Sequence, residues 1–211
     1  MWGLSRARAW PVVLRDAELV LRPIQVADGW EWSRVRLRNA DWLQPWEATV
    51  PPGAGPGPTT FRELVRGLQR AARAGRMMPF VIEVEGRLVG QVTVNNVVRG
   101  SAQFASIGYW VDRDVAGRGL VPRAVALAID HCFEGAGLHR VEICIRPENS
   151  NSLRVVEKLG LHEVGFAPAF LHIDGAWRDH RIYAVTTEEV AGSMLQRLRD
   201  PCGDQSHESH Q

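Results

Sequence analysis

Two glycines flank an arginine at positions 117 to 119, where a strand-like run passes into a helix-like run. Glycines at such a turn let the backbone approach a ligand, and the amide groups at a helix start attract anions. We therefore expect free N–H groups of residues 115–120 to point outward and bind a phosphate or pyrophosphate. Pro122 agrees with this expectation, because a proline in the first helical turn gives up an N–H that has no partner there. The pattern also suits a plain tight connection, and spacing alone leaves both interpretations open.

Two familiar phosphate motifs do not explain this turn. A P-loop ends in Gly-Lys-Ser or Gly-Lys-Thr, and neither triplet follows Gly119. The dinucleotide fingerprint needs a third glycine three positions after the second, where this chain has Pro122. What remains is a general anion site.

Length and composition limit the classes of protein. The chain has 211 residues, 45% of them apolar, which is enough for one substantial core and favours one compact unit. Its 25 basic and 24 acidic residues give a formal net charge of +1, which argues against a nucleic-acid or membrane surface. Three cysteines without CxxC spacing, no secretory signal and no long apolar run predict a reduced, cytoplasmic protein. Cys202, His207 and His210 do not complete a four-ligand zinc site, so we expect no metal.

Apolar periodicity and turn residues outline the elements that must position the turn. The expected strands are 19–22, a hairpin over 79–98, 101–112, 139–146 and 180–190. The expected helices are one after Asp28, one at 61–75 capped by Thr59 or Thr60, one from the glycine turn to Gly135, and one at 152–160. This order predicts an α/β fold with helices on both faces of a mixed sheet. The proline- and glycine-rich run 50–60 is expected to be a flexible loop.

Two segments, taken together, resemble a known family. "IGYWVDRDVAGRGLVPRAV" resembles the acetyl-CoA-binding segment of the GNAT superfamily of N-acetyltransferases, and "RPENSNSLRVVEKLGL" resembles the segment that follows it in that superfamily. "LVLRPIQVAD", "WLQPWE" and "HIDGAWRDHRIYAV" resemble the RimJ/RimL-type branch, which acetylates the N-terminal amines of ribosomal proteins. The resemblance covers Leu19 to Val185, and two motifs in family order are more specific than either alone.

The resemblance implies a GNAT-like, mainly antiparallel mixed sheet with helices on both faces. It implies one N-acetyltransferase domain over residues 1–198, followed by a disordered tail at 199–211. Acetyl-CoA is the implied co-substrate, and the acceptor is the N-terminal amine of a protein, plausibly a ribosomal one, in a monomer or a homodimer. Two alternatives remain: a small amine of the aminoglycoside or polyamine type as acceptor, or an acyl-CoA-binding module without turnover.

One departure from the superfamily concerns the turn itself. Asp114 stands where the superfamily often has Gln or Arg, and an acid would not help to hold a pyrophosphate. We therefore assign pyrophosphate binding to backbone amides, with help from Arg113 and Arg118. The implied cofactor-binding set is Trp110, Val111, Arg113, Val115, Ala116, Gly117, Arg118, Gly119, Leu120, Asn149 and Ser152.

Acetyl transfer needs a polarised carbonyl and a protonated leaving thiolate. By resemblance, a backbone N–H of the strand Gly108–Val111 binds the thioester oxygen, and Tyr109 on that strand is a catalytic candidate. Asn149 is expected to bond the pantetheine. The Ser152 hydroxyl either passes a proton to the sulfur or caps the following helix, and the sequence leaves both open.

The base and the acceptor site are the least defined parts. Glu163 is the first candidate for the base, since this branch often carries an acid there. Asp179 and His180 match the branch motif and are expected to line the acceptor site, although His180 also fits a packed strand histidine. Trp42, Trp46 and Trp110 are candidates for an aromatic acceptor groove, although each also fits a core residue, and Trp46 is the one expected to contact the acceptor. Tyr183 is interpreted as an apolar wall.

Overall fold

The computed structural model describes residues 10–55 and 57–200. Eight strands form one sheet: β1 (Leu14–Asp16), β2 (Leu19–Pro23), β3 (Met78–Val84), β4 (Arg87–Val98), β5 (Phe104–Val111), β6 (Arg140–Ile145), β7 (His162–Ile173) and β8 (Ala176–Thr186). The α-helices are α1 (Gly29–Arg38), α2 (Ala40–Leu43), α3 (Phe61–Arg73), α4 (Leu120–Asp130), α5 (Ser150–Lys158) and α6 (Met194–Arg199). Short helical turns are η1 (Val26–Asp28), η2 (Gln44–Trp46), η3 (Arg113–Val115), η4 (His131–Gly135) and η5 (Thr187–Glu189).

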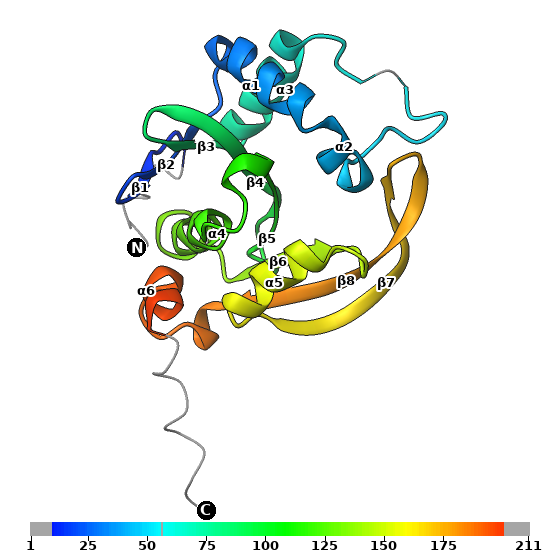
Figure 1. The fold of residues 1–211 in the computed structure, drawn as a ribbon. Helices are drawn as coiled ribbons and strands as arrows, with labels where there is room; N and C mark the ends of the chain where they lie inside the picture. The colour runs from blue at the N-terminus through cyan, green and yellow to red at the C-terminus, as the bar shows by residue number, and fades with distance from the viewer. Residues whose placement is uncertain (1–9, 56, 201–211) are drawn as a thin grey trace, which may run out of the picture.

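The sheet is mainly antiparallel, with the strand order β1-β2-β3-β4-β5-β6-β8-β7 (Figure 1). The pair β5 and β6 is parallel, because α4 crosses over between these two strands. This arrangement confirms the expected α/β class and the mixed, mainly antiparallel sheet.

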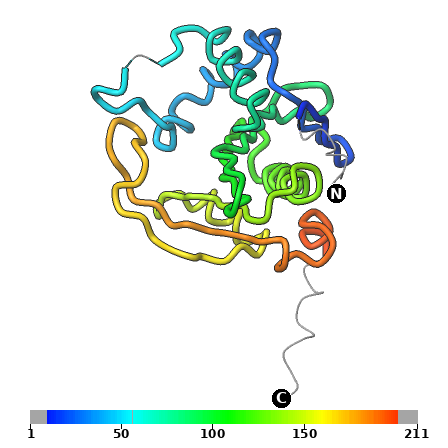
Figure 2. The backbone as a smooth tube through the Cα atoms, turned by 180° about the vertical axis from the view of Figure 1, so that it is seen from behind, coloured from blue at the N-terminus to red at the C-terminus, as the bar shows by residue number. Residues whose placement is uncertain are grey.

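Helices cover both faces of the sheet, and β3 shows why. Its side chains alternate between faces, so Val81 packs with Val35 of α1 and Val65 of α3. Phe80 and Ile82 point the other way and join the larger core that contains α4. Both views place α1 and α3 together on one side and α4 with α6 on the other (Figures 1 and 2).

The strands β7 and β8 form a long hairpin whose tip reaches the segment after η2. Ala48 bridges to Ile173, and the Thr49 amide donates to the His172 carbonyl at 2.9 Å. The hairpin tip lies beside α2 in Figure 1. The loop that follows Trp46 is thereby tied to the far end of the sheet.

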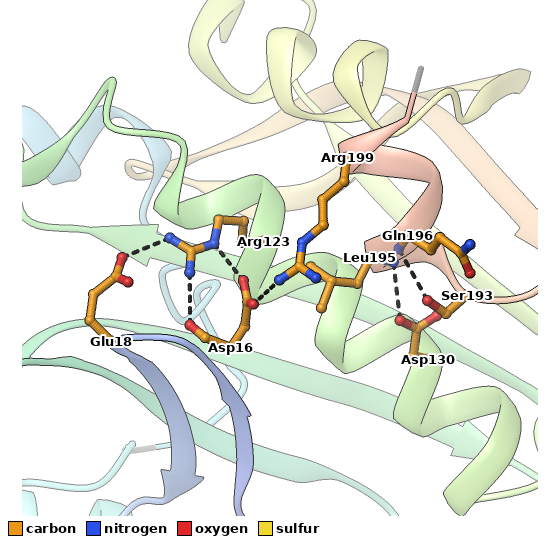
Figure 3. A network of polar contacts seen from close by, with 8 residues as sticks. All are labelled: Asp16, Glu18, Arg123, Asp130, Ser193, Leu195, Gln196 and Arg199. Carbon is orange, nitrogen blue, oxygen red and sulfur yellow. Dashed lines mark hydrogen bonds and ion pairs between the residues drawn. The ribbon is translucent and has the colours of Figure 1, made fainter. Parts of the chain in front are cut away.

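A network of polar contacts fastens α4 to β1 and α6 (Figure 3). Arg123 of α4 donates from Nε to the buried carboxylate of Asp16 at 2.6 Å, and Arg199 of α6 pairs with the same carboxylate. Asp130 at the other end of α4 accepts from the amides of Met194 and Leu195 at the start of α6. The helix that follows the glycine turn is therefore held at both ends.

Features that depend on residues close together in the sequence agree with the prediction. Thr60 caps α3 and accepts from the Glu63 amide at 3.2 Å, as one of the two expected caps. The strands β1 and β7 and the helix α6 were not predicted. The expected domain end at 198 falls one residue before the end of α6, because Arg199 is still helical and pairs with Asp16.

The remaining tail, with Cys202, His207 and His210, lies outside the described residues. Within residues 10–55 and 57–200, no group of three or more His, Cys, Asp or Glu side chains is placed to hold a metal ion. Over the same ranges, no helix combines the length and the apolar character needed to cross a bilayer.

Candidate active site

The site begins where β5 and β6 separate. These strands pair only over three residues, from Phe104 with Arg140 to Ser106 with Glu142, although β5 continues to Val111 and β6 to Ile145. On its other edge β5 stays paired with β4 as far as Val111. The edge of β5 that faces β6 is therefore open beyond Ser106, and its amides are available to a ligand.

A cleft of about 870 Å³ lies at this opening. It is lined by the last residues of β5, the glycine turn, the start of α4 and the exposed side of α5. Apart from Asn149 and Ser152, seven residues of the expected cofactor-binding set line this cleft: Trp110, Val111, Val115, Ala116, Gly117, Gly119 and Leu120. Trp42 and Trp46 also line the cleft, so the three tryptophans expected to form an acceptor groove lie together in this cleft.

The glycine turn has the geometry of an anion cradle. Gly117 has φ +82° and Gly119 has φ +75°, which only glycine adopts without strain. A Cβ added at either residue would meet nothing within 4 Å, so both face open space. The amides of Leu120 and Val121 lie in the first turn of α4, where N–H groups have no helical partner. The residues present therefore fit a phosphate group.

Two of the expected amides are occupied, which corrects the sequence interpretation. The Val115 amide donates to the Asp112 carbonyl at 3.2 Å, and the Ala116 amide donates to the Arg113 carbonyl at 3.1 Å. These bonds form η3, which turns the chain from β5 toward Gly117. The anion site is therefore shorter than expected and starts at Gly117.

A buried polar pair holds this turn against α1. Asp112 is 1% exposed and accepts from the Asn39 side chain at 2.9 Å. Asn39 in turn accepts from the Arg113 amide at 3.0 Å, and Arg38 pairs with Asp112 from the outside. Because Asn39 and Asp112 are far apart in the chain, no sequence spacing indicated this pair.

At the start of α5, Asn149 is the residue that caps the helix. Its side-chain oxygen accepts from the Ser152 amide at 3.1 Å. The Ser152 hydroxyl is thus not the N-cap group, and that alternative is wrong. Asn149 and Ser152 both line the large cleft, beside the open edge of β5.

A second, smaller cleft of about 200 Å³ adjoins the first. The two clefts share five lining residues: Trp46, Gly108, Tyr109, Asn149 and Ser152. The smaller cleft has an apolar wall made of Ile107, Ile143, Ile145, Leu171 and Ile173. His180, which is 3% exposed, also lines it. The structure thus brings Ser152, Tyr109, Trp46 and His180 together.

Burial shifts the pKa values of both Tyr109 and His180. Burial raises the pKa of the Tyr109 hydroxyl, which donates to the Ser152 carbonyl at 3.4 Å. Burial lowers the pKa of His180 below its ordinary 6.5. At neutral pH both groups are therefore uncharged.

Several expected site residues line neither cleft. Glu163 lies on the exposed side of β7, where its carboxylate accepts from Tyr183 at 3.3 Å and pairs with Arg181 at 3.5 Å. Asp179 accepts from the Ala169 amide at 2.8 Å and so supports an irregular stretch of β7. Tyr183 lies with Glu163 and packs partly against the core, so it is not a wall of the site. Arg113 and Arg118 are exposed beside the turn.

Residues that the sequence interpretation missed also line the large cleft. Arg154 and Lys158 lie four residues apart on the exposed face of α5 and add positive charge opposite the glycine turn. Their i,i+4 spacing directly after Ser152 was the signal that could have identified them. Arg36 lies over the Trp110 ring at 5.3 Å and pairs with Glu47.

A family model described as Acetyltransferase (GNAT) domain matches residues 18–162. The chain belongs to the GNAT acetyltransferase family.

Within the GNAT family, the chain is similar to proteins of the RimJ/RimL type. The structure of Mycobacterium smegmatis RimJ in complex with CoA-disulfide is 40% identical, with a TM-score of 0.83, and the match covers 92% of this chain and 96% of that one. The [ribosomal protein uS5]-alanine N-acetyltransferase of Escherichia coli (strain K12) is 28% identical over 186 residues, 87% of this chain and 95% of that protein. The probable N-acetyltransferase YjcK of Bacillus subtilis (strain 168) is 40% identical over 101 residues, which span 48% of this chain and 56% of that protein.

These findings confirm the resemblance to GNAT enzymes of the RimJ/RimL type. This GNAT chain is an N-acetyltransferase, and enzymes of the family take the acetyl group from acetyl-CoA. The glycine cradle, the basic face of α5 and the open edge of β5 fit the phosphates and the thioester arm of that donor.

Proposed function

We propose that this acetyl-CoA-dependent acetyltransferase transfers its acetyl group to the N-terminal α-amine of a protein, and that the acceptor is a ribosomal protein. The observation that carries the proposal is the smaller cleft across the opening between β5 and β6. It adjoins the large cleft, here taken as the donor cleft, at Tyr109 and Ser152, and its wall combines apolar side chains with the polar groups of Arg146, Asn149 and His180. Such a cleft suits the first residue of a peptide.

The charge of the two clefts supports a peptide over a polycation. Among the acidic residues that the structure describes, Glu47 alone lines either cleft, and it is paired with Arg36. The convergence of Glu47, Glu163, Asp174 and Asp179 that a polyamine or aminoglycoside would need is not found. Asp174 instead accepts from Gln44 at 3.3 Å near the hairpin tip. A polyamine that entered the clefts would lose water from its charged amines, and few carboxylates are there to compensate for that loss.

The relatives give this proposal its acceptor class. The Escherichia coli relative is named for an alanine of ribosomal protein uS5, and its match extends over 87% of this chain. The Mycobacterium smegmatis protein of the same type was solved with a CoA disulfide. A small N-terminal side chain is compatible with a cleft of about 200 Å³.

Acetyl-CoA supplies an acetyl group activated as a thioester. The amides at Gly117, Leu120 and Val121 hold its phosphates, and the open edge of β5 offers an N–H to the carbonyl oxygen. Ser152 does not cap α5 and lines both clefts, and its hydroxyl gives a proton to the departing sulfur. Tyr109 stays protonated because it is buried, and it supports this end of the site.

An acceptor screen tests the proposal. The protein is incubated with acetyl-CoA and peptides that carry ribosomal-protein N-termini, and fragmentation mass spectrometry locates the acetyl group. Matched peptides with a blocked α-amine and a free lysine serve as controls, beside spermidine and an aminoglycoside. We expect acetylation of the free α-amine only. Acetylation of the small amines with no reaction at peptide N-termini would replace the proposal with the small-amine alternative, and tight acetyl-CoA binding without any turnover would replace it with the binding module.

A further inference from the structure

His180 is buried in the sheet and also lines the smaller cleft, which a histidine that only packs in a strand would not need to do. It lies in β8 opposite Ala167 of β7, is 3% exposed, and lines the smaller cleft together with Tyr109 and Ser152. The Phe170 ring meets the imidazole edge-to-face, with ring centroids 5.8 Å apart. The imidazole is thus held in a small cleft of mixed apolar and polar lining, which adjoins the large cleft through Tyr109 and Ser152.

One hydrogen bond determines the tautomer of His180. The Nδ1 atom lies 3.0 Å from the carbonyl oxygen of Arg178, and a carbonyl oxygen can only accept. Nδ1 therefore carries the hydrogen, and Nε2 of the neutral ring keeps a lone pair. A second group that orients a histidine in this way is a recurrent feature of catalytic bases.

We propose that His180 is the general base that takes the proton from the attacking amine through Nε2. This assignment rests on the proposed function in one respect: an amine, of whatever kind, must bind in the smaller cleft. As the amine nitrogen attacks the carbonyl carbon, the C–N bond forms, the C–S bond breaks, and the electron pair of that bond leaves on sulfur. The nitrogen becomes more acidic as it bonds, and its proton passes to Nε2. The Ser152 hydroxyl gives a proton to the sulfur, and solvent returns the protons between turnovers.

The surroundings keep His180 neutral before the reaction. Burial is the main reason for its lowered pKa, and the positive charge of Arg146 acts in the same direction. Asp179, Glu148 and the Arg178 carbonyl act in the opposite direction. Cys144 on the facing strand β6 stays a thiol, since burial raises its pKa to about 11. A neutral imidazole in this cleft is ready to accept a proton at pH 7.

The contrast with Glu163 favours this assignment. The Glu163 carboxylate already accepts from Tyr183, pairs with Arg181 and lines neither cleft. His180 lines the cleft that holds the acceptor in the proposed function. We therefore place the base on β8 and not on β7.

The first test is the variant His180→Asn, whose amide can keep the donor to Arg178 while the Nε2 lone pair is lost. We expect kcat at pH 7 to fall by about 10²-fold, within the range of general base catalysis. Acetyl-CoA affinity should stay at the wild-type value. At acid pH the wild-type kcat should depend on two deprotonations, those of the amine and of His180, and the variant on that of the amine alone. The exposed His162→Asn on β7 is the matched control and should behave as wild type.

The second test needs no turnover and uses the wild-type protein without ligand. Nitrogen-15 NMR of the histidine side chains reports the tautomer and the pKa of His180, with His180→Asn used for assignment or, if it does not fold, His180→Gln. We expect the Nδ1–H tautomer and a pKa below 6.5. An Nε2–H tautomer, a charged ring at pH 7, or an unchanged kcat in His180→Asn would overturn the assignment. All rates are measured on every amine that the protein acetylates, so failure with peptide N-termini affects the proposed function and leaves the His180 test intact.

Discussion

The side-chain oxygen of Asn149 accepts a hydrogen bond from the Ser152 amide at 3.1 Å. This bond makes Asn149 the N-cap of α5 and places Ser152 in the first turn of that helix. Both residues line the donor cleft, so one holds the helix and the other offers a hydroxyl where the two clefts meet. Of the two roles that the sequence left open for Ser152, capping therefore belongs to Asn149, and proton donation by Ser152 stays a prediction.

Ser152→Ala should lower turnover without loosening α5. We expect kcat to fall by about 10- to 100-fold, because the departing sulfur loses its proton donor. Acetyl-CoA affinity and the free energy of unfolding should stay at wild-type values, measured by calorimetry and urea denaturation. Ser150→Ala, at an exposed position of the same helical turn, is the control. A normal kcat in Ser152→Ala would remove the serine from the mechanism.

Asn149→Ala and Asn149→Asp separate capping from ligand binding. The alanine variant should lose about 0.5–2 kcal/mol of unfolding free energy, because the cap acceptor is gone. The aspartate variant keeps that acceptor and should be close to wild type in urea denaturation. Both lack the side-chain amide that is proposed to bond the pantetheine, so both should bind acetyl-CoA more weakly. Wild-type affinity in Asn149→Asp would limit Asn149 to its structural role.

Gly119→Ala has a matched control in Gly100→Ala. Both glycines have φ +75°, and an added Cβ meets nothing within 4 Å at either one. Both variants should therefore lose about 1–2 kcal/mol of stability from the left-handed backbone alone. Only Gly119→Ala should weaken acetyl-CoA binding in calorimetry, since its methyl group enters the anion cradle. Equal affinities of the two variants would contradict the placement of the phosphates.

Asp112→Ala tests the buried pair that positions the glycine turn. The Asn39 side-chain amide keeps the Val35 carbonyl as an acceptor but loses the second one, Asp112, in the interior, which should cost about 1–3 kcal/mol of unfolding free energy. The turn is then less well held, so the KM for acetyl-CoA should rise more than kcat falls. Asp114→Ala removes an exposed acid of the same turn and should not weaken acetyl-CoA binding. Similar kinetics in the two variants would show that the turn needs no support from α1.

The lowered pKa of His180 also predicts how stability depends on pH. Its pKa is lower in the folded than in the unfolded chain, so the unfolded chain binds the extra proton first. The associated stability is present above the unfolded value of about 6.5 and is lost as the pH falls through the folded value. Urea denaturation at about pH 8 and about pH 5 should show a larger loss for wild type than for His180→Asn. An equal loss in both proteins would mean that the pKa of His180 is not lowered by folding.

Features that depend on neighbouring residues could be predicted from the sequence. The glycine turn, the cap of α3 by Thr60 and the start of a helix after Asn149 each involve contacts within a few residues. The family motifs are of the same kind, because they record short segments that bind the donor. The residues that line the donor cleft were therefore largely predictable, but Arg154, Lys158 and the internal hydrogen bonds of the Val115 and Ala116 amides were not.

The smaller cleft, the proposed acceptor site, was decided only by the tertiary structure. The strand β7 was missed because its burial pattern does not alternate cleanly, and its pairing with β8 takes His180 into the interior while Glu163 stays exposed. The separation of β5 from β6 and the pairing of Asn39 with Asp112 join parts of the chain that are distant in sequence. Local propensity carries no information about such contacts, because they form only when the sheet assembles. The sequence thus determined that acetyl-CoA has a place to bind, and the packing of β6, β7 and β8 decided which side chains line the smaller cleft, where we propose that the amine binds.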